Sequence, residues 1–484
     1  MALRPNATAP VLITYADRLA GSIGGVLALL DGELDGAFAG VHLLPFFVPI
    51  DGADAGFDPI DHTEVDPRVG SWESVAALAS RYDVMADVIV NHVSAQSGPF
   101  LEWLAQGDDA PSAAMFLTPQ RVFGSTPSPA DLTEIYRPRP TSPFTDVEFA
   151  DGTHRTVWTT FTDQQIDIDV EHPLGWAHLI DILDRFQSAG ITSVRLDAVG
   201  YAIKRAGTSC FMLPDTLEFV RHLTAAGHER SMRVLVEMHG HHLDQLAVAA
   251  DVDLVYDFAL PPLILDAIYT GDAAPLRRWI EMRPPNAINV LDTHDGIGVI
   301  DVGTDARDPT RRGLLTPERI HDLVETIHDR SEEVSRAATG AAASNLDLYQ
   351  VNCTFYDALG RDDDRYLAAR MIQCMLPGTP QIYYVGLLAG TNDSALLART
   401  GVGRDINRRH YTRPEIDEAL ARPVVQRLLA LLRWRATEPA FDGVFALLDS
   451  EPHVLAVRWS SPGSTVTIEV DLITADVTIG SIPG

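Results

Sequence analysis

The chain has 484 residues, of which 46% are hydrophobic and 21% are charged, and its formal net charge is −30 at pH 7. Such an acidic protein repels nucleic acid and anionic membrane surfaces. No stretch approaches the roughly 18 uninterrupted apolar residues needed to cross a bilayer, and the first ten residues lack the apolar core of a signal peptide. We therefore expect a cytoplasmic protein without a nucleic-acid or membrane partner.

Two residue types are unusually sparse. The three cysteines, Cys210, Cys353 and Cys374, are far apart in the chain, which suits reduced core thiols better than a disulfide framework. All but one of the 37 basic residues are arginines, and the exception is Lys204. Schiff-base or Walker-type chemistry would need this lysine, and no GxxxxGK[ST] motif surrounds it.

The pattern of apolar residues predicts an α/β fold. Eight short apolar runs read as strands, at 11–15, 40–47, 84–90, 191–196, 233–237, 254–258, 288–292 and 381–385. Between most of them lie segments whose apolar residues recur at helical spacing, as at 72–82, 174–188 and 215–225. The last of these opens with Pro214 and Asp215. Eight alternating repeats predict a closed (β/α)8 TIM barrel. An open doubly wound sheet is the alternative, but no glycine-rich phosphate turn follows the first strand.

Two long gaps interrupt the alternation, after strands 3 and 7. We expect inserted domains at 92–167 and 296–360, with the barrel formed by 1–91, 168–295 and 361–439 and a small C-terminal β-domain at 440–484. The second gap carries a helical stretch near 318–337. The run of small residues at 338–344 then precedes Asn345, Asp347, Tyr349 and Gln350, which predicts a mobile loop that brings polar groups to a site.

Carboxylates follow several of the predicted strands. Asp197, Glu237 and Asp295 each end or follow an apolar run, and the third run ends near Asp87 and His92. A single acid of this kind is most simply a strand-end salt bridge, but several at successive strand ends of a barrel indicate an active site. Arg195 lies two residues before Asp197 and so points to the same face, where it would hold that carboxylate ionised and oriented. An ionised Asp beside a protonatable Glu is what double displacement at a sugar carbon requires.

These residues stand in familiar strings. DVIVNH, GITSVRLDAVGY, LVEMH and VLDTHD resemble the four ordered regions of the α-amylase superfamily of retaining α-glucosidases and transglycosidases. The longer strings HLLPFF, DGADAGFDPIDHT, IYRPRP, AGTSCF, VYDFALPP, AASNLDLYQVNCT and GRDINR resemble the sucrose phosphorylase group within it. The resemblance implies reversible conversion of sucrose and inorganic phosphate into α-glucose 1-phosphate and fructose, with retention, as expected of a hexosyltransferase that needs no cofactor.

The resemblance also implies roles for single residues. Asp197 would be the nucleophile, Glu237 the general acid/base and Asp295 the transition-state stabiliser. The glucosyl pocket would be lined by Asp54, Phe57, His92, Phe161, Arg195, His294 and Arg404. The acceptor side would hold Tyr136, Arg139, Tyr201, His239, Leu346, Asp347, Tyr349 and Gln350, with Tyr136, Arg139, His239 and Tyr349 as phosphate-binding residues. Asp54 and Arg404 together would close the pocket around one glucosyl unit.

The HGHH segment at 239–242 departs from the expected pattern, as does Met238. We interpret its histidines as part of a solvated loop, with an added phosphate or acceptor contact as the alternative. A metal site of His239, His241, His242 and Asp244 is a third interpretation, although the family needs no catalytic metal.

Other functions stay open at this stage. A barrel can host metal-dependent hydrolysis or sugar binding without catalysis. Within the superfamily the alternatives are a phosphorylase of sucrose 6'-phosphate, glucosylglycerol or glucosylglycerate, and a retaining α-glucosidase. The oligomeric state is left open, with a homodimer among the options.

Overall fold

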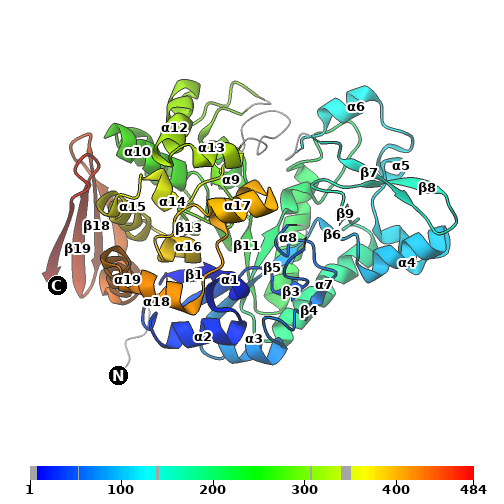
Figure 1. Cartoon of the computed structure of the whole chain (residues 1–484). Helices are drawn as coiled ribbons and strands as arrows, with labels where there is room; N and C mark the ends of the chain where they lie inside the picture. The colour runs from blue at the N-terminus through cyan, green and yellow to red at the C-terminus, as the bar shows by residue number, and fades with distance from the viewer. Residues whose placement is uncertain (1–7, 53, 138–140, 306–307, 340–349, 484) are drawn as a thin grey trace.

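The computed structural model describes residues 8–52, 54–137, 141–305, 308–339 and 350–483. Its centre is a closed barrel of eight parallel strands (Figure 1). In chain order the barrel strands are β1 (Val11–Thr14), β2 (Gly40–Leu43), β5 (Asp83–Ile89), β10 (Ser193–Asp197), β11 (Arg233–Val236), β12 (Leu254–Asp257), β13 (Ala287–Asn289) and β16 (Thr379–Tyr383). All eight predicted runs therefore contribute a strand, and the predicted TIM barrel is confirmed.

Helices surround the barrel, as an all-parallel sheet with two buried faces requires. They are α1 (Ala16–Ala20), α2 (Ile23–Asp31), α3 (Trp72–Ala79), α7 (Pro173–Ser188), α8 (Pro214–Glu229), α9 (His242–Ala249), α10 (Leu260–Thr270), α11 (Ala274–Met282), α15 (Asp363–Met375), α18 (Arg413–Ala421) and α19 (Pro423–Thr437). Proline occupies the first turn of α7, α8, α11, α18 and α19, where its missing N–H costs no helical hydrogen bond. The described helices include none that is both long and apolar enough to cross a membrane.

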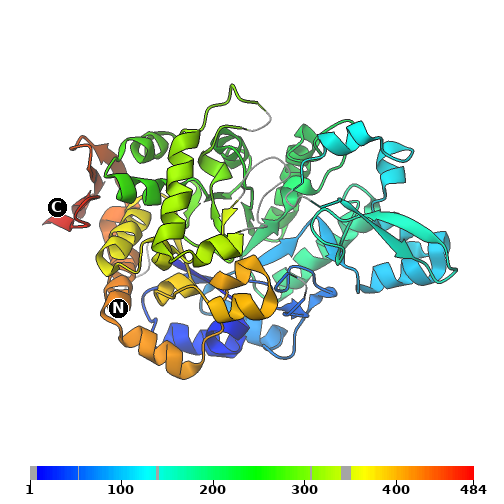
Figure 2. The same ribbon diagram turned by 45° about the horizontal axis from the view of Figure 1, so that its top comes forward.

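A large insertion separates β5 from α7 and projects away from the barrel (Figures 1 and 2). It comprises β6 (His92–Ser94), α4 (Gly98–Gln106), α5 (Pro119–Phe123), α6 (Pro129–Glu134), β7 (Phe144–Glu148), β8 (His154–Trp158) and β9 (Gln165–Asp167). At its base β6 pairs antiparallel with β9, so that His92 lies opposite Asp167. The insertion is thereby anchored beside the end of β5, at the mouth of the barrel.

Shorter elements lie in the other long connections. The connection after β2 contains the antiparallel pair β3 (Phe47–Val48) and β4 (Asp61–Val65). After β13 come β14 (Ile297–Gly298), α12 (Pro317–Arg330), α13 (Val334–Thr339), β15 (Gln350–Val351) and α14 (Phe355–Ala358). After β16 come α16 (Tyr384–Leu387) and α17 (Ser394–Thr400), followed by a 3-10 turn at Gly403–Asn407. Of the predicted small-residue loop, 338 and 339 end α13, while 340–349 lie outside the described residues.

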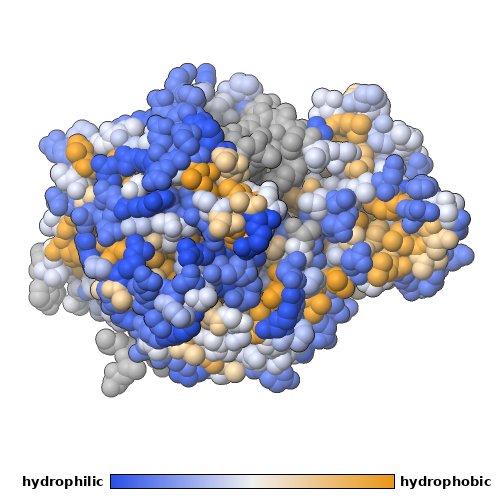
Figure 3. Space-filling view, in the orientation of Figure 1, coloured by the Kyte–Doolittle hydropathy of each residue, from blue (hydrophilic) through white to orange (hydrophobic). Residues whose placement is uncertain are grey.

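The C-terminal segment forms an antiparallel sheet of β17 (Val444–Leu448), β18 (Val454–Ser461), β19 (Ser464–Asp471) and β20 (Val477–Pro483). The Trp459 indole N–H donates to the Met375 carbonyl oxygen at 2.7 Å, which fastens the sheet to the end of α15. The sheet lies at the opposite end of the molecule from the insertion (Figure 1). The surface seen in Figure 3 is largely hydrophilic over the barrel helices, as the excess of acidic residues suggests.

Candidate active site

A pocket opens at the carboxyl ends of the barrel strands. It is lined by Asp54, Phe57, His92, Phe161, Gln165, Asp197, Ala198, Tyr201, Glu237, His294, Asp295 and Arg404. All of these except Gln165 and Ala198 are residues that the sequence predicted for the site. Because the strands are parallel, their ends meet at one rim, which is why residues so distant in the chain converge here.

Arg195 is buried and is not among the residues that line the pocket, but it holds several carboxylates together. Strand β10 pairs with β5 so that Arg195 lies beside Asp87, and its Nη1 contacts Asp87 Oδ1 at 2.5 Å and Asp197 Oδ1 at 2.9 Å. Its Nη2 contacts Glu237 Oε1 at 3.0 Å. The side chain is 1% exposed, so these charge-assisted contacts are hardly screened by water. One guanidinium thus orients both carboxylates that the sequence predicted to react.

The surroundings of Asp197 act on its pKa in opposite directions. Burial raises the pKa of the Asp197 carboxyl well above its usual value, Arg195 lowers it, and Glu237 and Asp87 raise it further. Arg195 contacts Asp197 as predicted and lowers its pKa, although burial has the larger and opposite effect. Asp197 and Glu237 both contact this guanidinium. A retaining mechanism needs one proton on this pair.

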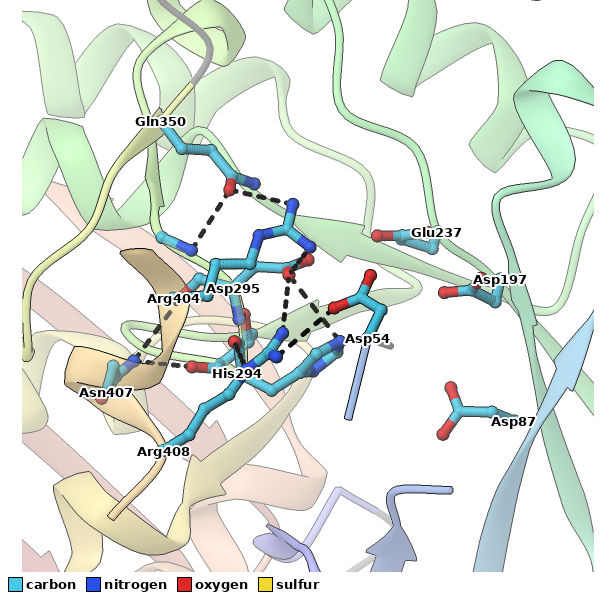
Figure 4. Close-up of polar contacts among 12 residues, drawn as sticks. Asp54, Asp87, Asp197, Glu237, His294, Asp295, Gln350, Arg404, Asn407 and Arg408 are labelled. Carbon is cyan, nitrogen blue, oxygen red and sulfur yellow. Dashed lines mark hydrogen bonds and ion pairs between the residues drawn. The ribbon is translucent and has the colours of Figure 1, made fainter. Parts of the chain in front are cut away.

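Asp295 lies across the pocket from Asp197 and Glu237 (Figure 4). Arg404 Nη1 is 2.7 Å from its Oδ1, and Arg408 Nη2 is 3.9 Å from the same atom. Burial alone would raise the pKa of Asp295, but Arg404, His294 and Arg408 lower it far below its usual value. Arg408 Nη1 also lies 3.4 Å from Asp54 Oδ1, which links Asp54 to the same cluster. Asp295 is therefore a fixed negative charge.

Two neutral histidines contribute to the pocket wall. Burial lowers the pKa of His294 to about 3, and its ring stacks on Phe57 with the ring centroids 4.7 Å apart. Burial also lowers the pKa of His92, whose Nε2 donates to the Phe57 carbonyl oxygen at 2.8 Å. Neutral imidazoles can hydrogen-bond sugar hydroxyls without adding positive charge to the pocket.

Aromatic residues form the wall beneath the insertion. Phe161 packs edge-on against Tyr201, with ring centroids 5.2 Å apart, and Tyr136 stacks on Tyr201 at 6.4 Å. Phe211 contacts both tyrosine rings, at 4.9 Å from Tyr136 and 4.7 Å from Tyr201. The structure therefore brings Tyr136 and Tyr201 together, and their assignment to the acceptor side stays a prediction.

The histidines at 239–242 are not part of a solvated loop, so that interpretation is wrong. His239, His241 and His242 are each at most 5% exposed. His239 stacks on Phe258 at 3.8 Å, and its Nδ1 lies 3.0 Å from Asp301 Oδ2. Burial opposes a charge on His239, but Asp301 raises its pKa. The adjacent backbone N–H of Gly240 also donates to Asp301, at 3.1 Å.

The proposed metal ligands point to different partners. His239 faces Asp301, His241 Nε2 donates to the Arg312 carbonyl oxygen at 3.1 Å, and Asp244 pairs with Arg311. Within the described residues, Glu237, His239 and Asp295 have ligand atoms within 4.8 Å of one another. Asp295 in this group is already paired with Arg404. An arginine at that carboxylate opposes a cation.

Gln350 lies next to the pocket. Its amide N–H donates to His239 Nε2 at 3.2 Å, while its Oε1 accepts from Arg404 Nη2 at 3.3 Å and from the Gly296 backbone N–H at 3.2 Å. The remaining predicted acceptor residues, Arg139, Leu346, Asp347 and Tyr349, lie outside the described residues.

Sequence reasoning missed several residues of this cluster. Arg408 is the last residue of the GRDINR string, but its reach to Asp54 depends on the chain turning back over the barrel. Asp301 gave no signal beyond being an acid in a long gap. Ala198 has a φ of 55°, a left-handed conformation uncommon for alanine, and its backbone N–H donates to Glu237 Oε2 at 3.1 Å. No sequence pattern marked that strained position.

A parallel barrel with three carboxylates at its strand ends is typical of enzymes that cleave glycosidic bonds by retention. Comparison with known families identifies which family this is. The family model described as alpha amylase, catalytic domain, matches residues 16–281, and the chain belongs to the alpha-amylase family. Within that family it is 58% identical to a sucrose phosphorylase from Agrobacterium vitis, over 93% of this chain and 92% of the relative. It is 51% identical to a sucrose phosphorylase from Bifidobacterium adolescentis, over 94% and 91%.

A solved structure is also similar over the whole chain. The sucrose 6F-phosphate phosphorylase from Thermoanaerobacter thermosaccharolyticum superposes with a TM-score of 0.91 at 35% identity, covering all of this chain and 96% of that one.

Proposed function

We propose that this chain catalyses the reversible phosphorolysis of sucrose to α-glucose 1-phosphate and fructose, through a covalent glucosyl-enzyme with retention of configuration. The observation that carries the proposal is the set of Asp197, Glu237 and Asp295 around one pocket, with Asp197 and Glu237 both in contact with the Arg195 guanidinium. The identity of 58% to a sucrose phosphorylase over most of both chains selects the substrate.

In the first step Asp197 attacks the anomeric carbon of the glucosyl unit and the bond to fructose breaks. Glu237 protonates the departing fructose oxygen as general acid. Positive charge develops at the anomeric carbon in the transition state, and the permanently ionised Asp295 stabilises it. At this moment Glu237 must carry the proton and Asp197 must be ionised, because only then can Asp197 act as the nucleophile.

In the second step phosphate attacks the glucosyl ester from the face that fructose has left. Glu237, now a carboxylate, accepts a proton from the incoming group, and Asp197 is released. Phosphate is an anion in an acidic protein, so it needs local positive charge. His239 is a second candidate for phosphate binding, but its Nε2 accepts from the Gln350 amide in this arrangement, so it would have to gain a proton there to act as a cation. Arg139 remains our candidate for a bidentate contact to phosphate oxygens.

The pocket also suits a single terminal glucosyl unit. Asp54 and Arg408 form a charged pair at 3.4 Å, and Arg404 closes the same side through Asp295. Charged groups in this position can bind the hydroxyls farthest from the bond that is cut. A longer glucan would have to displace this cluster, which argues against an endo-acting hydrolase.

The remaining alternatives differ at the acceptor side. A phosphorylase of sucrose 6'-phosphate is represented by a relative at 35% identity, against 58% for a sucrose phosphorylase. Glucosylglycerol or glucosylglycerate as substrate, or simple α-glucoside hydrolysis, would use the same three acids. A metal-dependent hydrolase would lose its activity in the presence of a chelator. We expect a chelator to leave the activity of this protein unchanged.

The experiment is incubation of the protein with sucrose, with and without inorganic phosphate, followed by assay of glucose 1-phosphate and free glucose. Glucose 1-phosphate should form only with phosphate present and should exceed free glucose. Free glucose in equal amounts under both conditions would assign the protein to the hydrolases. Sucrose 6'-phosphate, glucosylglycerol and glucosylglycerate offered in parallel should be poorer substrates. A homodimer and a cytoplasmic location stay predictions, the first to be tested by light scattering.

A further inference from the structure

Lys204, the single lysine of the chain, is buried behind the pocket wall. Its side chain is 1% exposed. Its ammonium group lies 2.6 Å from Asn91 Oδ1, 2.6 Å from Asp167 Oδ2 and 2.5 Å from the Tyr201 carbonyl oxygen. An ammonium carries three N–H donors, so these three oxygens account for all of them.

The three oxygens come from three different segments of the chain. Asn91 follows β5, at the end of the barrel strand. Asp167 ends β9, the last strand of the insertion, and Tyr201 lies in the 3-10 turn Val199–Tyr201 after β10. The insertion and two barrel connections therefore meet at one side-chain nitrogen.

Each segment carries a residue of the pocket. Asn91 precedes His92, whose Nε2 donates to the Phe57 carbonyl oxygen. Asp167 accepts from the Thr160 backbone N–H at 3.0 Å and from its hydroxyl at 2.5 Å, and Thr160 precedes Phe161. Tyr201 is itself a wall residue. His92, Phe161 and Tyr201 all line the pocket, yet Lys204 does not.

We propose that Lys204 is a positioning residue, whose ammonium group sets the relative places of His92, Phe161 and Tyr201 and hence the shape of the sugar pocket. The inference deepens the proposed function and rests on it. A neutral side chain of similar length could fill the space but could not bond three oxygens at once. An arginine in its place would bring a larger, planar group into a site built around a single nitrogen.

The alternative is that Lys204 merely neutralises Asp167. The side chain of Asp167 is fully buried, and a buried carboxylate without its cation is strongly destabilising. The two roles separate in a pair of variants. The single variant Lys204→Met removes the positive charge and the three N–H donors, and it leaves the Asp167 carboxylate buried without a cation. The double variant Lys204→Met/Asp167→Asn removes that carboxylate charge as well.

If Lys204 positions the pocket, the double variant should recover most of the melting temperature that the single variant loses but not its activity. Both variants should show kcat/KM at least about tenfold below the parent, because small misplacement of binding groups is costly in rate. Turnover should be measured with sucrose and with α-glucosyl fluoride, each per folded molecule. A folded double variant with the parent's kcat/KM on both substrates would overturn the inference.

Arg283→Met is the matched control for stability. Arg283 is also buried, and its Nε contacts Asp257 Oδ2 at 2.7 Å, but it does not line the pocket. It should lower the melting temperature without changing kcat/KM of the folded protein.

A second route does not depend on the double variant. Lys204→Ala leaves room for a propylammonium ion, which should restore activity in a saturable manner, whereas tetramethylammonium at equal ionic strength should not, since it has no N–H donor. Equal effects of both salts would contradict the positioning role. If the parent protein fails on sucrose but turns over α-glucosyl fluoride, the proposed function fails while the fluoride still tests Lys204.

Discussion

The substitution Glu237→Gln removes the proton that a general acid would donate and keeps the size and shape of the side chain. It therefore tests the acid role of Glu237. Glu237 Oε1 contacts Arg195 Nη2 at 3.0 Å, and Oε2 accepts the Ala198 backbone N–H at 3.1 Å. Glutamine has one oxygen and one NH2 group, so one of these two donors must face another donor. Leaving a buried donor unsatisfied costs about 1–3 kcal/mol, which lowers stability whatever the substrate.

The comparison of two substrates cancels that common cost. Fructose leaves poorly without a proton, whereas fluoride needs little acid assistance. General acid catalysis contributes a factor of roughly 100 to 10,000, so the ratio of activity on sucrose to activity on α-glucosyl fluoride should fall by about that factor. The assay is initial rate on each substrate with the parent and the variant. Equal losses on both substrates would refute the acid role of Glu237.

Glu171→Gln is the matched control. Glu171 is a half-exposed glutamate that pairs with Arg205 outside the pocket. The same chemical change there should leave both activities unchanged.

The other predictions concern the nucleophile, the phosphate and pH. Asp197→Asn should reduce sucrose turnover by several orders of magnitude with the fold intact by circular dichroism, because no other residue forms the ester; near-parental activity would remove Asp197 from this role. Arg139→Ala should raise KM for phosphate by roughly tenfold or more and shift the products towards free glucose, whereas an unchanged ratio would favour His239 with Tyr349 instead. Burial lowers the pKa of His62 to about 3, against about 6.5 in an unfolded chain, so the unfolded state binds the proton first and the free energy of unfolding should fall as pH drops from about 6.5 towards 3. His62→Gln should flatten the dependence of melting temperature on pH in that window, and the exposed His154→Gln should not.

The barrel and its three acids could be predicted because they depend on local patterns. Each barrel strand is a short apolar run between helical segments, and parallel strands place their carboxyl ends at one rim. Asp197, Glu237 and Asp295 therefore had to meet once the barrel was inferred. The C-terminal sheet was predicted for the same reason, since the pattern changes to short strands after Ala440.

The misses arise where contacts between distant segments decide the outcome. The pKa of Asp197 depends on its burial and on the neighbouring Arg195, Glu237 and Asp87, which no strand pattern reveals. A run of histidines resembles a hydrophilic loop, but His239 is buried against Phe258 and held by Asp301. Lys204 gave only a compositional signal, because its partners lie in three separate segments.

Mass spectrometry of a trapped intermediate tests the central claim most directly. The Glu237→Gln variant should be mixed with α-glucosyl fluoride in the absence of phosphate, quenched in acid and digested. Deglucosylation by water is slow without a general base, so the peptide that contains Asp197 should gain the mass of one anhydroglucose unit. Added phosphate is already an anion and depends less on a base than water does, so it should still discharge the sugar as α-glucose 1-phosphate. Turnover of the fluoride with no modified peptide, or with the sugar on a different acid, would contradict the mechanism.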